Sequence, residues 1–196
     1  MNKIFSSFVA AALLFSLPAA GFAAEIGSDK PVRWEVRVGF GEQYTNNHRP
    51  NDFDMWMVLP SLAVPISRTG GGTPDFLEGR FEWAPELNLA LFTHPYHRGL
   101  FGVTPLQFRY VFQPAWKIKP YFFGGVGVLY SNINRRETRS DWNFNPQGGG
   151  GVYYDFSDTA SLILEYRHIH ISNAGLHEDN AGINSHNVLL GVSFKK

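Results

Sequence analysis

Two side chains near the C-terminus have the types and the spacing of a nucleophile and its base. His170 and Ser172 are separated by one residue within an alternating segment that spans residues 161–173. Side chains two apart on a strand share a face and lie about 6.6 Å apart along the strand axis, so the two can be brought within hydrogen-bond reach. A serine becomes a competent nucleophile when a neighbouring base removes its proton. The pair therefore indicates acyl-transfer chemistry through a serine.

The face that carries this pair is otherwise hydrophobic. Leu162, Leu164 and Tyr166 fall on the same side of the segment by parity. If that side touches lipid, the pair stands where hydrocarbon is expected, and its substrate is a membrane lipid. The simpler alternative is that the polar side chains lie at the level of the lipid headgroups, where the cost of an ionisable group falls toward zero.

Alternating runs of this kind recur along the chain and predict the fold. Eight such runs cover roughly residues 33–41, 53–66, 76 to past 85, 100–112, 117–130, 142–156, 161–173 and 183–194. A tilted transmembrane strand needs about 9 to 11 residues, and the runs are close to that length. The turn signals between them favour an all-β meander, and eight strands make a small closed barrel. The sequence therefore predicts an eight-stranded antiparallel transmembrane β-barrel over residues 24–196.

The first residues predict export. Lys3 precedes an apolar stretch at 4–17 and a segment of small residues at 19–24, a pattern typical of a secretory signal peptide, which we place at residues 1–23. The chain contains no cysteine, so the exported fold is not expected to depend on disulfides. Its 17 basic and 17 acidic side chains balance, which excludes a general attraction to nucleic acid.

Alternation alone does not say which face is outside, because a soluble lipocalin-like barrel shows the same period. The polar face combines charges of both signs with glycines such as Gly125 and Gly149, as a narrow, ion-paired lumen requires. Bulky aromatic side chains occupy the opposite face. The last alternating run closes on Phe194, which resembles the C-terminal signature of outer-membrane proteins. These features favour a barrel in the bacterial outer membrane.

The lengths of the connections orient this barrel. Residues 46–52, 93–99, 131–141 and 173–182 lie in longer polar links, whereas 113–116 and 157–159 are tight. Outer-membrane barrels keep short turns on the periplasmic side and long loops outside. We therefore expect His170 and Ser172 at the external end of the wall.

The residues around the pair resemble the signature of a known family. The stretch reads His170-Ile171-Ser172-Asn173-Ala174-Gly175, and Asn180 follows it. This is similar to the outer-membrane lipid A 3-O-deacylases of the PagL type, which are eight-stranded barrels with an active site on the lipid-facing exterior. The match is dense over 161–173, the following loop and 183–194, and elsewhere it depends on the barrel architecture.

The resemblance implies a role for each residue of the signature. Ser172 is the nucleophile and His170 its general base. Asn173 and the backbone near Gly175 hold the oxyanion of the tetrahedral intermediate, a service worth about 10² to 10³ in rate per donor in other acyl-transfer enzymes. Asn180 matches a further asparagine of the family loop and shapes the site. The reaction implied is hydrolysis of an ester-linked acyl chain of lipid A, the acylated glucosamine anchor of lipopolysaccharide, at the 3-O position.

One position departs from the family pattern. The family has a glutamate fourteen residues after the histidine to orient it, and here that position is Asn184. By parity Asn184 starts a strand next to the segment of His170, so its location suits the role. An amide oxygen can accept the imidazole N–H but adds no negative charge. Glu178 and Asp179 are alternative partners for the histidine, whereas Glu165 is not favoured because it should face the lumen.

Other interpretations stay open beside the esterase. A metal cluster of His168, His170, His177 and His186 is compatible with ligand geometry, but the serine-hydrolase explanation of His170 is preferred. No metal or organic cofactor is expected. The expected partners are lipid A or lipopolysaccharide and membrane lipids, without nucleic acid, and a homodimer is left open. The leading alternative function is a non-catalytic outer-membrane barrel of the adhesin or structural type with a degenerate site.

Overall fold

The computed structural model describes residues 32–44, 53–69, 77–94, 97–113, 116–131, 138–178 and 180–195, of which 67–69 are described by their backbone alone. The signal peptide expected at residues 1–23 lies outside the described residues. The described residues form one continuous sheet of antiparallel strands. Among them, no helix is long and apolar enough to cross a membrane.

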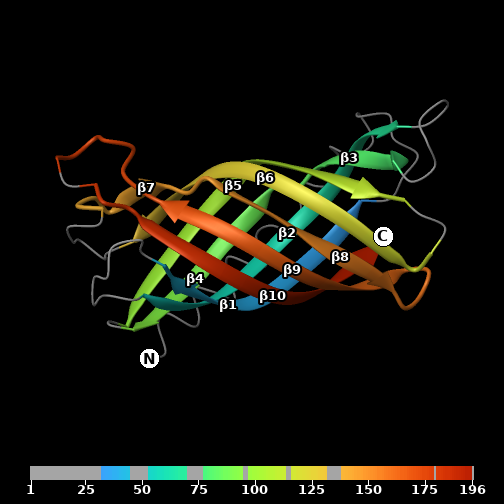
Figure 1. Ribbon diagram of the computed structural model, residues 1–196, viewed down its shortest axis with the longest axis horizontal. Coiled ribbons are helices and arrows are strands. Elements are labelled where there is room, and N and C mark those ends of the chain that lie inside the picture. The colour runs from blue at the N-terminus through green and yellow to red at the C-terminus, as the bar shows by residue number, and fades with distance from the viewer. Residues whose placement is uncertain are drawn as a thin grey trace.

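Ten strand segments follow one another along the chain (Figure 1). They are β1 (Arg33–Gln43), β2 (Asp54–Thr69), β3 (Gly79–Trp83), β4 (Glu86–His94), β5 (Arg98–Phe112), β6 (Ile118–Ser131), β7 (Trp142–Phe144), β8 (Gln147–Asp155), β9 (Ala160–Ile171) and β10 (Ile183–Lys195). Strand segments that follow one another along the chain pair antiparallel, except β3 with β4 and β7 with β8, and β1 pairs with β10 from Arg33↔Lys195 to Gln43↔Ser185. The sheet is therefore closed into a barrel.

The ten segments make up the eight strands of the barrel, because two of these strands are each interrupted at a proline. Segments β3 and β4 both lie between β2 and β5, and they are separated by Ala84 and Pro85. Likewise β7 and β8 both pair with β6 and are separated by Asn145 and Pro146. Proline has no N–H for the ladder, so it breaks the regular pattern. The structure confirms the predicted eight-stranded antiparallel barrel, with an unpredicted break at Pro146.

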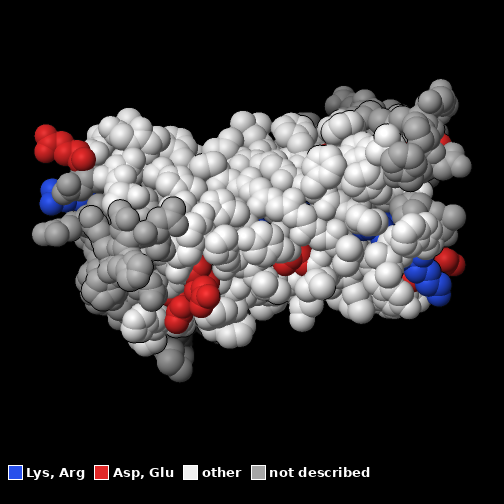
Figure 2. Space-filling model, in the orientation of Figure 1, with Lys and Arg blue, Asp and Glu red and all other residues white. Residues whose placement is uncertain are grey.

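The outer wall is apolar, as the alternation predicts. On β9, Leu162, Leu164 and Tyr166 are each about half exposed, while Ile163 and Glu165 between them are buried. On the face drawn in Figure 2 most of the wall is uncharged, and the larger charged groups lie toward its two ends. Strand residues that point outward therefore present hydrocarbon to the membrane, and those that point inward fill the lumen.

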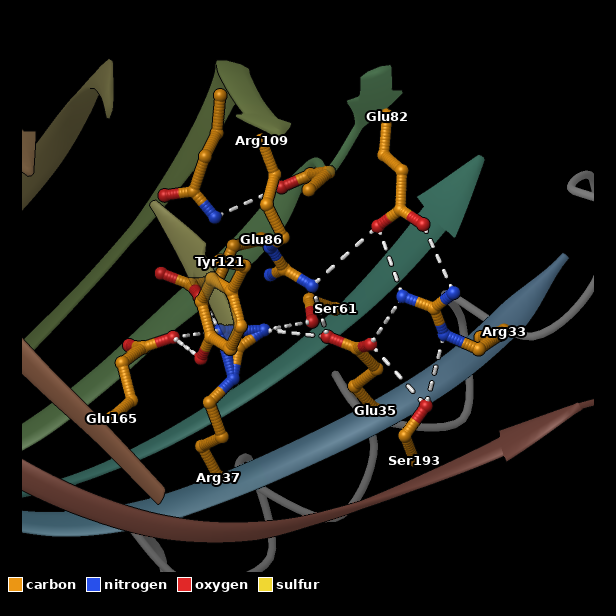
Figure 3. A network of polar contacts seen from close by, with 12 residues as sticks. Arg33, Glu35, Arg37, Ser61, Glu82, Glu86, Arg109, Tyr121, Glu165 and Ser193 are labelled. Atoms are coloured by element: carbon orange, nitrogen blue, oxygen red, sulfur yellow. Dashed lines mark hydrogen bonds and ion pairs between the residues drawn. The ribbon is translucent and has the colours of Figure 1, made fainter. Parts of the chain in front are cut away.

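One half of the lumen is a network of ion pairs (Figure 3). Four buried arginines and four buried glutamates face one another there: Arg33, Arg37, Arg109, Arg167, Glu35, Glu82, Glu86 and Glu165. Arg33, for example, binds Glu82 through both of its terminal nitrogens at 2.9 Å. The equal numbers of opposite charges come from β1, β3, β4, β5 and β9, and they hold these strands together around a filled interior. This half confirms the predicted ion-paired lumen.

The other half of the lumen is hydrophobic, which the alternation did not predict. Its side chains form one cluster: Phe53, Met55, Met57, Leu59, Ala90, Phe92, Leu100, Leu129, Ile169, Ile171, Ile183 and Leu189. Ile169, Ile171 and Ile183 belong to the parts of β9 and β10 that carry His170 and Asn184 on their outer face. The wall behind this outer face is therefore held by a packed hydrophobic core.

Candidate active site

His170 and Asn184 lie opposite each other on neighbouring strands, with their side chains on the outer face. The antiparallel register pairs His170 of β9 with Asn184 of β10. The Nδ1 atom of His170 lies 2.8 Å from Oδ1 of Asn184, a hydrogen-bond distance. The Asn184 partner that the sequence analysis inferred from the family spacing therefore contacts the histidine in the structure.

This contact sets the proton on the imidazole ring. An amide oxygen only accepts hydrogen bonds, so Nδ1 of His170 carries the hydrogen and donates it to Asn184. In the neutral ring the other nitrogen, Nε2, then has the free lone pair that a general base needs. Asn184 thus orients the ring as a carboxylate would, but without a negative charge to stabilise the protonated form.

Gly182 lies against the same imidazole ring. A Cβ atom built on Gly182 would stand 2.7 Å from Cε1 of His170 and 3.3 Å from Nε2. Its φ angle is +73°, a conformation that side chains other than glycine rarely adopt. The sequence analysis missed this residue, and the only available signal was a glycine directly before the last alternating run. Its missing side chain leaves the space that the edge of the ring occupies.

Ser172 follows β9 on the same strand face as His170 but is more covered than the sequence analysis expected. Its exposed fraction is 8%. Its N–H donates to the Phe144 carbonyl at 3.1 Å, and its own carbonyl accepts the Phe144 N–H at 2.8 Å, so the short strand β7 closes over this end of β9. No hydrogen bond joins the hydroxyl to His170 in this structure. Catalytic hydrogen bonds are often long without substrate and tighten when it binds.

Asn173 and Asn180 hold the loop that follows the serine. The Asn173 side chain donates through Nδ2 to the Thr138 carbonyl at 2.6 Å and accepts the Gly175 N–H through Oδ1 at 2.8 Å. Asn180 accepts the Asn173 N–H through Oδ1 at 2.9 Å. Both ends of the Asn173 amide are thus engaged within the protein, and the N–H of Gly175 is engaged too. These contacts differ from the oxyanion role that the resemblance implied for Asn173 and Gly175.

The turn after Asn173 leaves one backbone donor without a protein acceptor. Leu176 N–H donates to the Asn173 carbonyl at 3.1 Å across a tight turn in which Ala174 and Gly175 have φ angles of +55° and +80°. Between Ser172 and Leu176, Ala174 has the one N–H for which the described residues supply no acceptor. Positive φ at an alanine is strained and tends to occur at functional sites.

A cluster of aromatic rings surrounds His168 and His186, which pair with each other two residues further from the loops than His170 and Asn184. Tyr44 stacks on His186 with ring centroids 4.0 Å apart, and its hydroxyl lies 3.5 Å from Nδ1 of His168. Tyr166 contacts the Nδ1 atom of His186 through its hydroxyl. Both histidines thus have tyrosine partners. Among the described residues no group of three or more histidine, cysteine or acidic side chains is arranged to hold a metal ion.

Glu178, the described one of the two loop carboxylates considered as partners, forms no hydrogen bond or ion pair with His170. Glu178 is exposed in the last loop, and Asp179 lies outside the described residues. Glu165 faces the lumen, where it binds Arg37 and Arg167, as the sequence analysis expected. Asn184 is therefore the side chain that the structure brings to Nδ1 of His170.

Comparisons with known proteins bear on the fold and the family of this chain. A search of curated protein sequences found no match. The outer membrane enzyme PagL has a crystal structure similar to this chain, with a TM-score of 0.62, 20% identity, and 81% of this chain and 97% of that one covered. Neisserial surface protein A is similar as well, with a TM-score of 0.59, 14% identity, and 84% and 97% covered.

These two likenesses show the fold, which is that of small outer-membrane barrels. A family model goes further. The model described as lipid A 3-O-deacylase (PagL) matches residues 78–193, from just before β3 almost to the end of β10. Since this match covers more than half of the sequence and includes His170, Ser172 and Asn184, the chain belongs to the lipid A 3-O-deacylase (PagL) family.

Proposed function

We propose that this outer-membrane protein is a serine esterase that removes an ester-linked acyl chain, at the 3-O position, from lipid A in the outer leaflet. The observation that carries the proposal is the His170–Asn184 pair on the outer wall of the barrel, next to Ser172 at the end of β9. A site on this wall is open to lipids that diffuse sideways in the membrane. Family membership supports the same substrate.

The mechanism uses one residue for each step. Nε2 of His170 takes the proton of Ser172, whose oxygen attacks the ester carbonyl, and the Asn184 oxygen holds the ring through Nδ1–H. The carbonyl oxygen becomes negative and accepts the Ala174 N–H, for which the described residues supply no acceptor. The protonated His170 then gives its proton to the departing sugar oxygen. Water hydrolyses the acyl-serine in a second round and releases the fatty acid.

Mass spectrometry of lipid A tests this proposal. Lipid A from cells that express the protein should lack one ester-linked acyl chain relative to cells without it, and the free fatty acid should be released in equal amount. Purified protein in lipopolysaccharide-containing membranes should give the same products. An unchanged lipid A in both preparations would contradict the proposed function.

A non-catalytic outer-membrane barrel is the second candidate, and one observation favours it. Asn184 replaces the glutamate of the family pattern, so protonated His170 has no negative partner on its Nδ1 side. If the site is degenerate for this reason, the wild-type protein and Asn184→Ala would not cleave lipid A, whereas Asn184→Glu would restore cleavage. The following measurement separates the two candidates.

Substitutions at Asn184 should change the rate in opposite directions. Hydrogen bonds to charged groups are about twice as strong as neutral ones, so Asn184→Glu should raise kcat about tenfold by stabilising the imidazolium. Asn184→Ala removes the acceptor of Nδ1–H and should lower kcat by about one to two orders of magnitude. Initial rates of fatty-acid release give kcat and KM for each variant. Equal kcat values for the glutamate, asparagine and alanine proteins would show that this position does not serve the histidine.

A further inference from the structure

The opposite end of the barrel carries a second group of polar side chains that the proposed esterase does not use. The ends of β5, β8 and β10 and the starts of β6 and β9 lie together there, at the other end of β9 from His170 (Figure 1). The Asp155 N–H donates to the Lys117 carbonyl at 3.0 Å, and the Lys195 N–H donates to the Thr159 carbonyl at 2.8 Å. Short turns mark the periplasmic side of outer-membrane barrels, so this end meets the inner leaflet.

Two adjoining hollows open at this end. The larger has a volume of about 490 Å³ and the smaller about 230 Å³, and both are lined by Lys119, Asp155 and Lys195. The larger one also has Lys117, Asp158 and the aromatic side chains of Trp116 and Phe156 in its lining. We call the larger hollow, with its three lysines and two aromatic residues, the periplasmic rim site.

Positive charge exceeds negative charge around these hollows. Five cationic side chains line them, namely Arg33, Arg80, Lys117, Lys119 and Lys195. The carboxylates are Asp155 and Asp158, together with Glu82, which pairs with both arginines. In the periplasmic rim site itself three lysines face two carboxylates, Asp155 and Asp158, so one positive charge is in excess. Figure 2 shows basic side chains at the end of the molecule where the C-terminus lies.

The lysines are held in place but keep donors for a ligand. Lys119 pairs with Asp155, which also accepts the Ser161 hydroxyl at 2.5 Å. Lys195 donates through Nζ to the Asp158 carbonyl at 2.8 Å. The Lys117 side chain forms no hydrogen bond or ion pair with the described residues, although its backbone carbonyl accepts the Asp155 N–H. An ammonium group has three N–H donors, so all three side chains can still bind an oxyanion.

Lys119, Asp155 and Lys195 lie on the lumen side of their strands, and apolar side chains border the hollow on its outer side. Trp116 is 69% exposed and Phe156 51% exposed. The neighbouring Ile118, the first residue of β6, is exposed as well. Aromatic side chains at this level of a membrane barrel lie at the boundary between acyl chains and headgroups. A ligand that fills the hollow therefore meets ammonium groups on one side and apolar surface on the other.

From this arrangement we propose that the periplasmic rim site binds the phosphate headgroup of a phospholipid in the inner leaflet. The lysines neutralise the phosphate, and Trp116 and Phe156 contact the glycerol and the first methylene groups of the acyl chains. A free phosphate ion would use the lysines but not the aromatic side chains. The site lies at the other end of the barrel from His170, so it does not depend on the proposed esterase activity.

Native mass spectrometry of the full-length protein in detergent tests the site with three probes: phosphatidylglycerol, diacylglycerol of the same chain length, and inorganic phosphate. Phosphatidylglycerol should bind, while diacylglycerol should bind at least tenfold more weakly because it lacks the phosphate. Inorganic phosphate at equal concentration should not displace the lipid. Displacement by inorganic phosphate would identify a site for a soluble anion and overturn the lipid assignment, as would equal binding of diacylglycerol.

A matched pair of substitutions locates the binding. A lysine near an anionic lipid surface contributes a factor of about five in affinity, so Lys117→Gln should weaken phosphatidylglycerol binding about fivefold. Arg98→Gln removes an exposed cation at the loop end of β5 and should leave binding unchanged. Trp116→Ala should weaken the lipid without changing its preference over diacylglycerol. Equal binding by the Lys117 and Arg98 variants would place the lipid elsewhere.

Discussion

Replacing Ser172 by alanine should abolish fatty-acid release while the barrel still folds. In other serine hydrolases, loss of the nucleophile lowers kcat by about 10⁶. The fold should tolerate the change, because the bonds that tie this end of β9 to β7 use the Ser172 backbone rather than its hydroxyl. Release of fatty acid from lipopolysaccharide is the measurement, with the different gel migration of heated and unheated barrel as the check on folding. A fluorophosphonate should label Ser172 in the wild-type protein and leave the alanine variant unlabelled.

Neighbouring residues supply matched controls. Ser185→Ala removes a hydroxyl from the lumen side of β10, and His168→Ala removes an imidazole from the outer face two residues before His170. Both should release fatty acid at close to the wild-type rate, whereas His170→Ala should be as inactive as Ser172→Ala. Activity that survives in both the Ser172 and His170 variants would reject a serine mechanism. Equal losses at His168 and His170 would instead indicate that histidines at this level serve only the membrane interface.

The sequence predicts the strands of this barrel well, because alternation constrains which side chains face outward and membrane thickness constrains the length of each strand. The runs at 33–41 and 183–194 correspond to β1 and β10, and their pairing closes the sheet. The interruption after Trp83 follows from Pro85, which the sequence analysis allowed for. The similar interruption at Pro146 was not predicted, because the aromatic alternation continues on both sides of it. Alternation also does not predict the hydrophobic half of the lumen. Where inward-facing Ile169 and outward-facing Leu164 are both apolar, residue type no longer distinguishes the lumen face from the lipid face.

The site was predictable only where parity and spacing decide the geometry. Parity placed His170 and Asn184 on the outer face, and the strand register brings His170 Nδ1 to 2.8 Å from Asn184 Oδ1. The cover over Ser172 depends on β7, which is distant in sequence and too short to be recognised by its period. The engagement of Asn173 by Thr138 likewise depends on a loop contact between residues 35 positions apart. Such contacts are set by how loops fold back on the wall, which local patterns do not encode.

Gly182 shows how a position without a side chain can control the histidine. The two contacts that fix the imidazole come from the same short stretch: Asn184 binds Nδ1, and Gly182 borders Cε1 and Nε2. A methyl group at Gly182 would stand 2.7 Å from Cε1, which is closer than Cβ contacts in real structures. The same methyl group would lie 3.3 Å from the backbone oxygen of Ile171, and of these two neighbours the imidazole ring is the one free to give way. The ring must therefore shift, and Nε2 shifts with it.

Gly182→Ala should consequently lower kcat by about 10² and leave KM nearly unchanged, because a misplacement of about 1 Å costs that much in rate. Gly175→Ala is the strain control. Its φ of +80° imposes a similar backbone cost on alanine, but a Cβ there meets no atom within 4 Å. The difference in kcat between the two variants therefore measures crowding of His170 alone. If both variants lose stability and activity to the same extent, backbone strain explains the loss, and Gly182 has no role in positioning the base.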